Sequence, residues 1–429
     1  MASLIVRKLA WCAAAFGLAA VAAPASGASY PQVQSAAEAL ARDAAVYAQA
    51  EGVSEAEALR RLRAQEASVV ATDRLRVLHR NRLAGLFIEH RPDYRIVVLL
   101  TGKKRVPPQT IIAGGTQIPV VFRTGAKATQ GKLSAAIVRY QASIRAALDH
   151  APAMGADPRT GELVILVNRK DAAREGADEL EERFEELTGV PVRIRVMDGE
   201  SADLGLEGGA RVHGVSGVSG RREYCTTGFV VTDGTRTGVV TAAHCPDELS
   251  YRDPQGSGDA KLSFLGQWGW SHQDVQLHVP DTEGLAHSAL VYADSAKTLA
   301  RPIEAVRRRA SSRVGDFVCR RGETSGFGCA QIELTDFAPP GDLCGGPCAP
   351  TWVMVKGACQ GGDSGGPVFI GTTALGIVKG GGTYSRSGKC DYWFYMSTDH
   401  LPKGWSVLTQ PAAALPQRAA ETSTSLLAK

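Results

Sequence analysis

Cysteine is absent from residues 13–224, and this absence divides the chain into two parts. Nine cysteines are present, of which Cys12 stands near the start and the other eight lie after position 220. An even number of cysteines confined to one part of a chain is typical of disulfides formed in an oxidising compartment. We therefore expect four disulfides in the second part and none in the first. The eight residues are Cys225, Cys245, Cys319, Cys329, Cys344, Cys348, Cys359 and Cys390.

Long apolar runs are also scarce. Arg7 and Lys8 precede an apolar run at residues 9–21, and small residues follow up to Ala28. This order is typical of a secretory signal peptide cut near Ala28. A membrane anchor is the alternative, but the run is shorter than the ~20 residues that a membrane span needs. No later stretch is long and apolar enough, so we expect residues 1–28 to be a signal peptide and the protein to be secreted to the extracellular space, with no membrane contact after signal removal.

Neither sign of charge dominates the sequence. The chain has 48 Lys and Arg residues against 44 Asp and Glu residues, a net charge of +4 over 429 residues. The basic residues are mixed with acidic ones, which gives no support for nucleic-acid binding. With 21% charged and 44% hydrophobic residues, the composition is that of folded globular protein, and the length predicts two or three domains.

Residues 29–205 alternate helix and strand patterns. Ala-rich, charged segments predict helices at 35–50 and 54–80, and Ser54 and Glu57 form a capping-box pattern at the start of the second. This mixture predicts a small α/β domain. The remaining patterns are a charged amphipathic helix at 170–187 and strands at 86–88, 96–100, 163–167 and 192–196.

From residue 206 the pattern changes to short β-type runs punctuated by glycine. Examples lie at 228–231, 238–241 and 374–378. Many short strands at regular spacing predict a β-sandwich or barrel, here over residues 206–408. The tail, residues 409–429, is rich in Ala, Pro, Ser and Thr, and we expect it to be disordered.

Two motifs in this β-rich part carry the chemistry. They read Thr-Ala-Ala-His-Cys at 241–245 and Gly-Asp-Ser-Gly-Gly-Pro at 362–367. A serine hydroxyl is a poor nucleophile at neutral pH, so acyl transfer needs a histidine to take its proton and a buried carboxylate to orient that histidine. A glycine-lined turn around the serine lets backbone N–H groups meet the oxyanion. We assign His244 and Ser364 to this chemistry, and the N–H groups of Gly362 and Ser364 to the oxyanion hole.

These motifs resemble the chymotrypsin superfamily of serine proteases, and finer features are similar to its bacterial alpha-lytic protease and streptogrisin group. Those features are Val-Cys-Arg-Arg-Gly at 318–322 followed by Cys329, Ala358-Cys359 before the serine motif, and a long N-terminal half. The resemblance covers roughly residues 205–407 strongly and the preceding half more weakly. It implies an all-β double β-barrel protease domain (chymotrypsin-like) preceded by an α/β propeptide domain, and a monomer that acts on polypeptide substrates without a cofactor.

The third member of the triad is expected to be a carboxylate between His244 and Ser364, as in the chain order of this superfamily. Asp274 is the preferred candidate, because it follows His244 by 30 residues, as in the bacterial group. It also begins Asp-Val-Gln-Leu after a turn-like Ser-His-Gln. Asp281 is the next candidate. The interval also holds Asp247, Asp253, Asp259 and Asp294.

A metal site is the competing interpretation of this region. His272, Asp274 and His278 are spaced so that they would share a strand face, but nothing supplies a dedicated fourth ligand. We therefore expect no metal and interpret His272 and His278 as surface residues near the site. The resemblance implies a different role for Asp363, whose carboxylate would pair with the new N-terminus or neighbouring polar groups and hold the serine turn.

The resemblance also implies how the disulfides pair. One bridge would fix the histidine loop, one would close a hairpin, and one would tie the serine loop to the specificity wall. Cys344 and Cys348 remain, and their Cys-Gly-Gly-Pro-Cys spacing would give a small local bridge that the group pattern lacks. A redox-active dithiol is the alternative, although no thioredoxin-like context surrounds this pair. The three implied pairs are, in that order, Cys225–Cys245, Cys319–Cys329 and Cys359–Cys390.

The resemblance implies that substrate is bound by Ala358, Lys379, Gly380 and Gly381. Ala358 stands where trypsin-like members carry an acid, so we expect an apolar or small side chain before the cleaved bond. Asp391, just after a cysteine, is the main argument against this expectation. Lys379 departs from the family, which commonly has a small serine before the glycines. A lysine there would either pair with Asp274 or point to solvent.

Together these features predict a secreted serine endopeptidase, made as an autoprocessed zymogen, that forms an acyl-enzyme on Ser364. We interpret residues 29–205 as a propeptide that assists folding and then inhibits the enzyme, with cleavage between about 198 and 210. A permanent accessory domain is the alternative for that half. A catalytically silent binding domain on a protease fold is favoured only by Lys379. An esterase on an α/β-hydrolase fold would need the chain order Ser, Asp, His, which is not seen.

Overall fold

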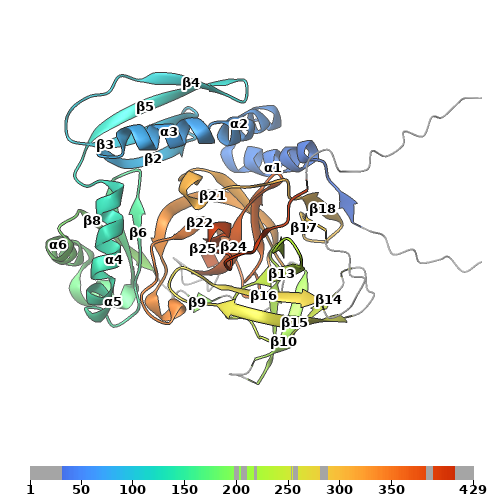
Figure 1. Cartoon of the computed structure of the whole chain (residues 1–429). Coiled ribbons are helices and arrows are strands. Elements are labelled where there is room, and N and C mark those ends of the chain that lie inside the picture. Colours follow the sequence, from blue (N-terminus) through green and yellow to red (C-terminus); the bar gives the residue numbers. More distant parts are fainter. Residues whose placement is uncertain are drawn as a thin grey trace, which may run out of the picture.

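The computed structural model describes residues 31–410 except 198–201, 204–209, 217–219, 253, 255–258, 281–287 and 383–389. The expected signal peptide, Asp281, residues 411–429 and most of the expected cleavage region lie outside the described residues. Figure 1 shows a mixture of helices and strands in the N-terminal half (blue to green) and β-strands throughout the C-terminal half.

The first β-barrel of the C-terminal half is built from one antiparallel sheet, with eight strands among the described residues. Their spatial order is β11-β10-β14-β15-β16-β13-β12-β26, so β26, the last strand among the described residues, pairs with β12. The β-type runs predicted at 228–231 and 238–241 become β12 and β13. The bounds are β10 Arg211–Val215, β11 Arg222–Thr226, β12 Val230–Thr232, β13 Thr237–Thr241, β14 Leu249–Arg252, β15 Asp259–Trp268, β16 Val275–Pro280 and β26 Ser406–Val407.

The second β-barrel closes on itself. Its strands follow the order β20-β23-β24-β25-β22-β21, and β21 pairs back to β20. Trp352, Phe337 and Phe394 pack in its interior at centroid distances of 5.5 and 6.3 Å. The double β-barrel implied by the resemblance is therefore confirmed. The bounds are β20 Phe317–Gly322, β21 Gly326–Ala338, β22 Trp352–Cys359, β23 Pro367–Ile370, β24 Thr373–Gly382 and β25 Cys390–Ser397. Three short strands precede β20 in the sequence: β17 Leu290–Tyr292, β18 Leu299–Pro302 and β19 Ala305–Val306.

The N-terminal half is an α/β region, as predicted, but two expected helices are each interrupted. The segment 54–80 breaks at Ser68, whose hydroxyl donates to the Gln65 carbonyl oxygen at 2.9 Å, and the segment 170–187 breaks at Gly176 (φ +100°). The bounds are β1 Gln32–Val33, α1 Ala36–Glu51, α2 Glu55–Ala67, α3 Val69–His79, β2 Leu83–Glu89, β3 Arg95–Thr101, β4 Gln109–Ala113, β5 Thr116–Ala126, α4 Gln130–Ala146, β6 Ala153–Asp157, β7 Glu162–Asn168, α5 Arg169–Glu175, α6 Ala177–Thr188 and β8 Val192–Met197.

Backbone pairing joins the N-terminal half to the second barrel. β6 runs antiparallel to the end of β21, with Gly155 opposite Phe337, and β7 and β8 extend the same sheet outward. β9 (Ala202–Asp203) pairs with β24, opposite Gly381 and Gly380. An exposed strand edge is a ready template for another strand, and the N-terminal half occupies two such edges here.

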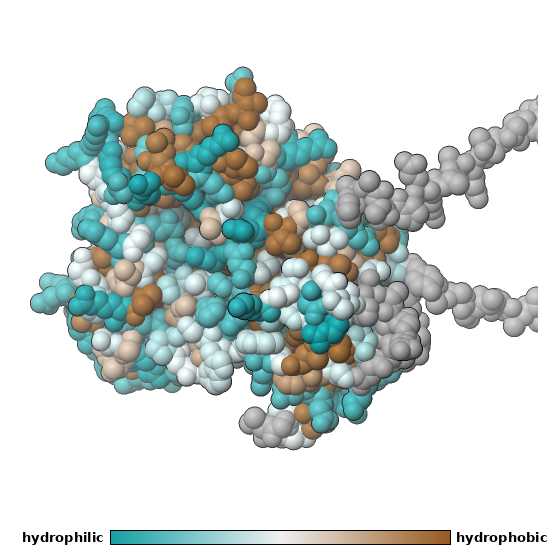
Figure 2. Space-filling model, in the orientation of Figure 1, coloured by the Kyte–Doolittle hydropathy of each residue, from teal (hydrophilic) through white to brown (hydrophobic). Residues whose placement is uncertain are grey.

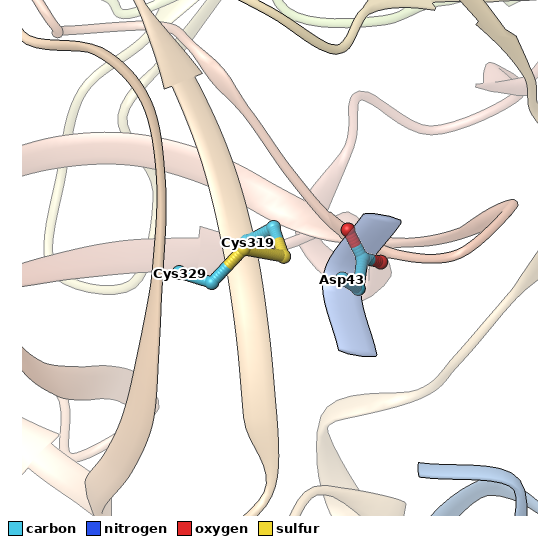
Figure 3. Close-up of side chains that lie close together, drawn as sticks. All are labelled: Asp43, Cys319 and Cys329. Atoms are coloured by element: carbon cyan, nitrogen blue, oxygen red, sulfur yellow. A yellow bond between two sulfur atoms is a disulfide. The ribbon is translucent and has the colours of Figure 1, made fainter. Parts of the chain in front are cut away.

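A buried ion pair joins helix α1 to the second half of the chain. Asp43 and Arg301 are both fully buried and lie 2.8 Å apart, and the Gly371 N–H also donates to Asp43 at 2.8 Å. Figure 3 shows Asp43 facing the Cys319–Cys329 disulfide. The three residues offer donor atoms within 4.8 Å of one another, but both sulfurs are bonded to each other and the carboxylate is held by Arg301. The cluster is therefore a structural junction.

The surface of the N-terminal half carries exposed apolar side chains. Figure 2 shows hydrophobic residues over the upper part of the view, where α3 and β4 lie, and Val77, Leu78 and Ile112 are largely exposed there. Among the described helices, none combines the length and the hydropathy needed to cross a membrane.

Candidate active site

His244 lies in the turn that follows β13. The turn is fixed at both ends, because Cys225 is joined to Cys245 and the Thr241 hydroxyl donates to the Thr226 carbonyl oxygen. Ala242 is buried within this turn, and its carbonyl oxygen accepts a hydrogen bond from Gln276 at 2.9 Å. The first barrel therefore holds the imidazole in one place.

Asp274 lies directly before β16 and is 2% exposed. Its Oδ2 lies 2.9 Å from Nδ1 of His244, and its Oδ1 accepts the His244 backbone N–H at 3.3 Å. Burial alone would raise the pKa of this carboxyl, but the neighbouring His244 and Lys379 lower the pKa to about 2. Asp274 is thus ionised at neutral pH, and since a carboxylate only accepts, Nδ1 of His244 carries the hydrogen.

Two other candidate aspartates of the interval, Asp259 and Asp294, have structural partners elsewhere. Asp259 pairs with Arg252 on the surface, and Asp294 accepts hydrogen bonds from Thr298 and Leu299 in a turn. Of the aspartates between the histidine and the serine that the structure describes, Asp274 is the one that meets the imidazole.

Ser364 lies in a tight turn between β22 and β23 and is fully buried. Its Oγ lies 2.9 Å from Nε2 of His244. Since Nδ1 carries the imidazole hydrogen, Nε2 is free of hydrogen and accepts the serine proton. The turn requires glycine, because Gly362 and Gly365 have φ of +105° and +83°, and a Cβ on Gly365 would lie 2.2 Å from Thr241 Oγ1.

Asp363 points away from the triad and braces the serine turn. Arg320 on β20 approaches its carboxylate at 2.9 Å, and the N–H groups of Ser325 and Gln360 each donate to it at 3.1 Å. The two partners expected for the Asp363 carboxylate were a new N-terminus and neighbouring polar groups. In the structure the carboxylate is held by neighbouring polar groups. Sequence reasoning did not identify Arg320 as the partner, although it lies in the Val-Cys-Arg-Arg-Gly segment that supported the resemblance.

Lys379 lies on β24 beside the triad and is 2% exposed. The register between β24 and β25 shifts between Val378 and Gly380, so Lys379 sits in a bulge that turns its side chain. Its Nζ lies 3.4 Å from Oδ2 of Asp274, and its carbonyl oxygen lies 3.2 Å from Ser364 Oγ. Of the two expected outcomes, pairing with Asp274 is the one observed.

A cavity of about 230 Å³ opens beside His244 and reaches Asp274 and Lys379. Trp270 and Leu343 form its apolar wall. Leu343 directly precedes the loop that Cys344 and Cys348 close, and Gly345 in that loop has φ +64° and would place a Cβ 2.3 Å from the Trp270 ring. The small disulfide loop therefore shapes one side of the cavity.

The residues expected to bind substrate gather on the edge of β24 and on β22. Gly380 and Gly381 pair with the backbone of β9, so the N-terminal half occupies this strand edge. Ala358 precedes Cys359, which is joined to Cys390, and the Ala358 carbonyl oxygen accepts a hydrogen bond from Arg320 at 2.6 Å. The structure contains all four cysteine pairs that were expected.

The two histidines interpreted as surface residues differ from each other. His272 is exposed, as expected, and its ring meets the His400 ring edge-on. The interpretation of His278 as a surface residue is wrong: it is fully buried, because β16 lies between β13 and β15 and the Phe264 ring packs 5.5 Å away. Burial lowers the pKa of His278 to about 4, so this side chain is neutral inside the fold.

We predict that His278 destabilises the fold in acid. The unfolded chain takes up a proton on this residue below pH ~6.5, whereas the folded protein does so only near its lowered pKa, so stability present above pH ~6.5 is lost as the pH falls toward about 4. The loss is about 3 kcal/mol of unfolding free energy. Denaturant unfolding of His278→Gln should show a correspondingly flatter pH dependence, whereas the control His272→Gln should follow the parent. Equal pH dependence in the parent and His278→Gln would contradict this.

Comparison with known proteins finds relatives of part of the chain. No family model matches the chain. Streptogrisin-D of Streptomyces griseus is 26% identical over 181 residues, which cover 41% of this chain and 43% of the relative. Streptogrisin-C of the same organism is 29% identical over 175 residues, which cover 39% of this chain and 35% of the relative. The matches thus span less than half the length of these curated relatives.

Solved structures with a similar arrangement include bacterial proteases. Thermobifida fusca Protease A is 24% identical with a TM-score of 0.36, and the match covers 48% of this chain and 99% of that one. Cellulomonas bogoriensis chymotrypsin is 22% identical with a TM-score of 0.36 and the same coverage. From the sequence matches and the two barrels described above, the chain is a homologue of the streptogrisins with the double β-barrel fold of the chymotrypsin-like serine proteases.

Proposed function

We propose that this protein is a secreted serine endopeptidase that hydrolyses peptide bonds through an acyl-enzyme on Ser364. Its homologues are serine proteases. The observation that carries the proposal is the chain of two 2.9 Å contacts from Ser364 Oγ through the His244 imidazole to Asp274. A hydroxyl, a base with an unprotonated ring nitrogen and a buried carboxylate in this order are the groups that acyl transfer needs.

The reaction proceeds in two steps. Ser364 Oγ attacks the peptide carbonyl carbon while His244 Nε2 takes the hydroxyl proton, and the Asp274 carboxylate stabilises the imidazolium that forms. The N–H groups of Gly362 and Ser364 bind the oxyanion. His244 then gives its proton to the leaving amine, which breaks the peptide bond and leaves the acyl-enzyme. Water, deprotonated by His244, attacks the ester, and the serine recovers its proton as the acid product leaves.

The N-terminal half acts in this proposal as a propeptide that assists folding and then inhibits the enzyme. Inhibition is supported by β9, which pairs with Gly380 and Gly381 where a substrate backbone is expected to lie. Assistance in folding is supported by the pairing of β6 with β21 and by the Asp43–Arg301 pair, because both join the N-terminal half to the β-rich half of the chain. A double β-barrel has many non-local contacts and folds slowly, so such a template has a physical purpose.

Substrate preference follows from the residues near the specificity wall. The proposed pocket base, Ala358, offers no charge, and the neighbouring cation Arg320 is engaged with Asp363 at 2.9 Å. An apolar or small side chain before the cleaved bond therefore suits the pocket best.

Covalent labelling tests the catalytic proposal. A fluorophosphonate probe should label the processed protein at Ser364, and Ser364→Ala should abolish both labelling and peptide hydrolysis. Asp274→Asn should lower kcat by about 10⁴-fold, because the imidazole then adopts the wrong tautomer. Labelling of a correctly folded protein at another residue would contradict the role of Ser364, and no labelling at all would support a catalytically silent binding domain.

A p-nitroanilide series tests the substrate preference. Substrates with Ala, Leu or Phe before the scissile bond should give higher kcat/KM than the matching Arg substrate, since an uncharged pocket does not compensate the desolvation of a guanidinium group. A higher kcat/KM for the Arg substrate would point to Asp391 as the specificity residue and would contradict the proposed preference for an apolar or small side chain.

Processing and refolding test the role of the N-terminal half. In a host without other proteases, Ser364→Ala should accumulate uncut, whereas the parent is cut between about 198 and 210. Residues 206–429 alone should refold slowly, and adding residues 29–205 in trans should speed their refolding and then inhibit the product. Trimming of Ser364→Ala at the same junction would rule out self-processing, and rapid refolding of the C-terminal part alone would rule out folding assistance.

A further inference from the structure

A buried lysine within ion-pair distance of a triad carboxylate is unusual chemistry, since acyl transfer itself does not require it. Lys379 is 2% exposed, and its Nζ lies 3.4 Å from Asp274 Oδ2 and 5.6 Å from the centroid of the Trp352 ring. Taking an ammonium group out of water costs several kcal/mol unless an opposite charge compensates it. The carboxylate of Asp274 provides that charge.

The segment that carries Asp274 is held in place from the second barrel, so this pairing is built into the fold. The Trp352 indole N–H donates to the carbonyl oxygen of Ser271 at 3.1 Å, and the Gln273 side chain donates to the His400 carbonyl oxygen at 2.8 Å. Ser271 has φ +55°, a conformation that non-glycine residues rarely adopt. The loop before Asp274 and the bulge at Lys379 therefore face each other in a defined geometry.

Other charged groups around the triad are compensated separately. Arg320 and Asp363 neutralise each other behind the serine turn. His272 and His400 lie at the rim of the loop before Asp274, and His278 on β16 contacts Gln276 and the Phe264 ring. Among the residues that the structure describes, Lys379 is thus a cation that shares the Asp274 carboxylate with His244. When His244 takes a proton, one carboxylate faces two cations.

We propose that Lys379 is a positioning residue that sets the working pH of the site: its ammonium group pairs with Asp274 and opposes protonation of His244, so the imidazole remains a base in more acidic solution. This inference rests on the proposed function and concerns how the same triad is tuned. The positive charge of Lys379 also lowers the rate of attack by Ser364, because it destabilises the His244 imidazolium that forms in that step. The lysine favours activity in acid at the expense of activity in alkali.

The pH profile of kcat/KM separates this role from a structural one. In Lys379→Gln, which removes the charge but keeps a polar group, the acid limb should move upward by about one pH unit. At pH 5 activity should then fall about tenfold, while above pH 8 it should equal or exceed that of the parent. Lys379→Arg, which keeps the charge, should retain the parent profile. Lys356→Gln removes an exposed lysine from β22 and should also leave it unchanged.

Titration of His244 makes the test independent of hydrolysis. In full-length Ser364→Ala protein with labelled histidine, NMR should show that adding Lys379→Gln raises the pH at which His244 protonates. If this shift appears although the parent hydrolyses no peptide, the proposed function fails and the role of Lys379 stands. An unchanged titration, or a loss of activity that is equal at every pH, would overturn the role of Lys379. Lys379→Ser gives the same prediction if glutamine is not tolerated.

Discussion

Asp274 carries a negative charge where water barely reaches, and much of the site depends on keeping that charge compensated. An unpaired buried carboxylate would cost several kcal/mol or take up a proton. His244 from the first barrel and Lys379 from the second both approach it, and the latter does so only because β24 bulges at this point. The triad is therefore also a contact between the two barrels. A change that separates the two barrels would move Lys379 away from Asp274 and leave the carboxylate with less opposite charge nearby. The geometry of the site and the packing of the barrels against each other therefore depend on each other.

The same reasoning applies to the junction between the two halves of the chain. The N-terminal half is attached through strand edges, β6 on β21 and β9 on β24, and through the buried Asp43–Arg301 pair. Backbone pairing depends little on side-chain identity, whereas a buried ion pair is selective, because loss of either partner leaves an uncompensated charge. If the N-terminal half is removed as proposed, Arg301 loses Asp43 and must be hydrated. In the proposed function, substrate binds along the edge of β24 at Gly380 and Gly381. As long as β9 of the N-terminal half pairs with this edge, substrate cannot bind there.

Much of the fold was predictable from the sequence, because the β-type runs are separated by glycine and the two motifs fix the family resemblance. The catalytic roles of His244 and Ser364 could be predicted without a structure, because each residue lies in a specific motif and the two motifs occur in the chain order of the chymotrypsin superfamily. The orientation of Lys379 was not predictable, because it depends on a bulge between strands that pair only in the folded barrel. His278 was misassigned for a similar reason. Its position in the sequence does not reveal that β16 lies between β13 and β15 or that the Phe264 ring packs against the imidazole. The breaks at Ser68 and Gly176 also depend on tertiary contacts or on a single backbone torsion.

The central claim is that the three groups joined by two 2.9 Å contacts act together to transfer an acyl group to Ser364. Rapid mixing of the processed protein with an activated p-nitrophenyl ester, followed by an acid quench and peptide mass mapping, tests it directly. The account predicts a burst of p-nitrophenol equal to the concentration of active sites, with the acyl group recovered on the peptide that contains Ser364. Steady hydrolysis with no burst and no acylated Ser364, or an acyl group on another residue, would contradict it.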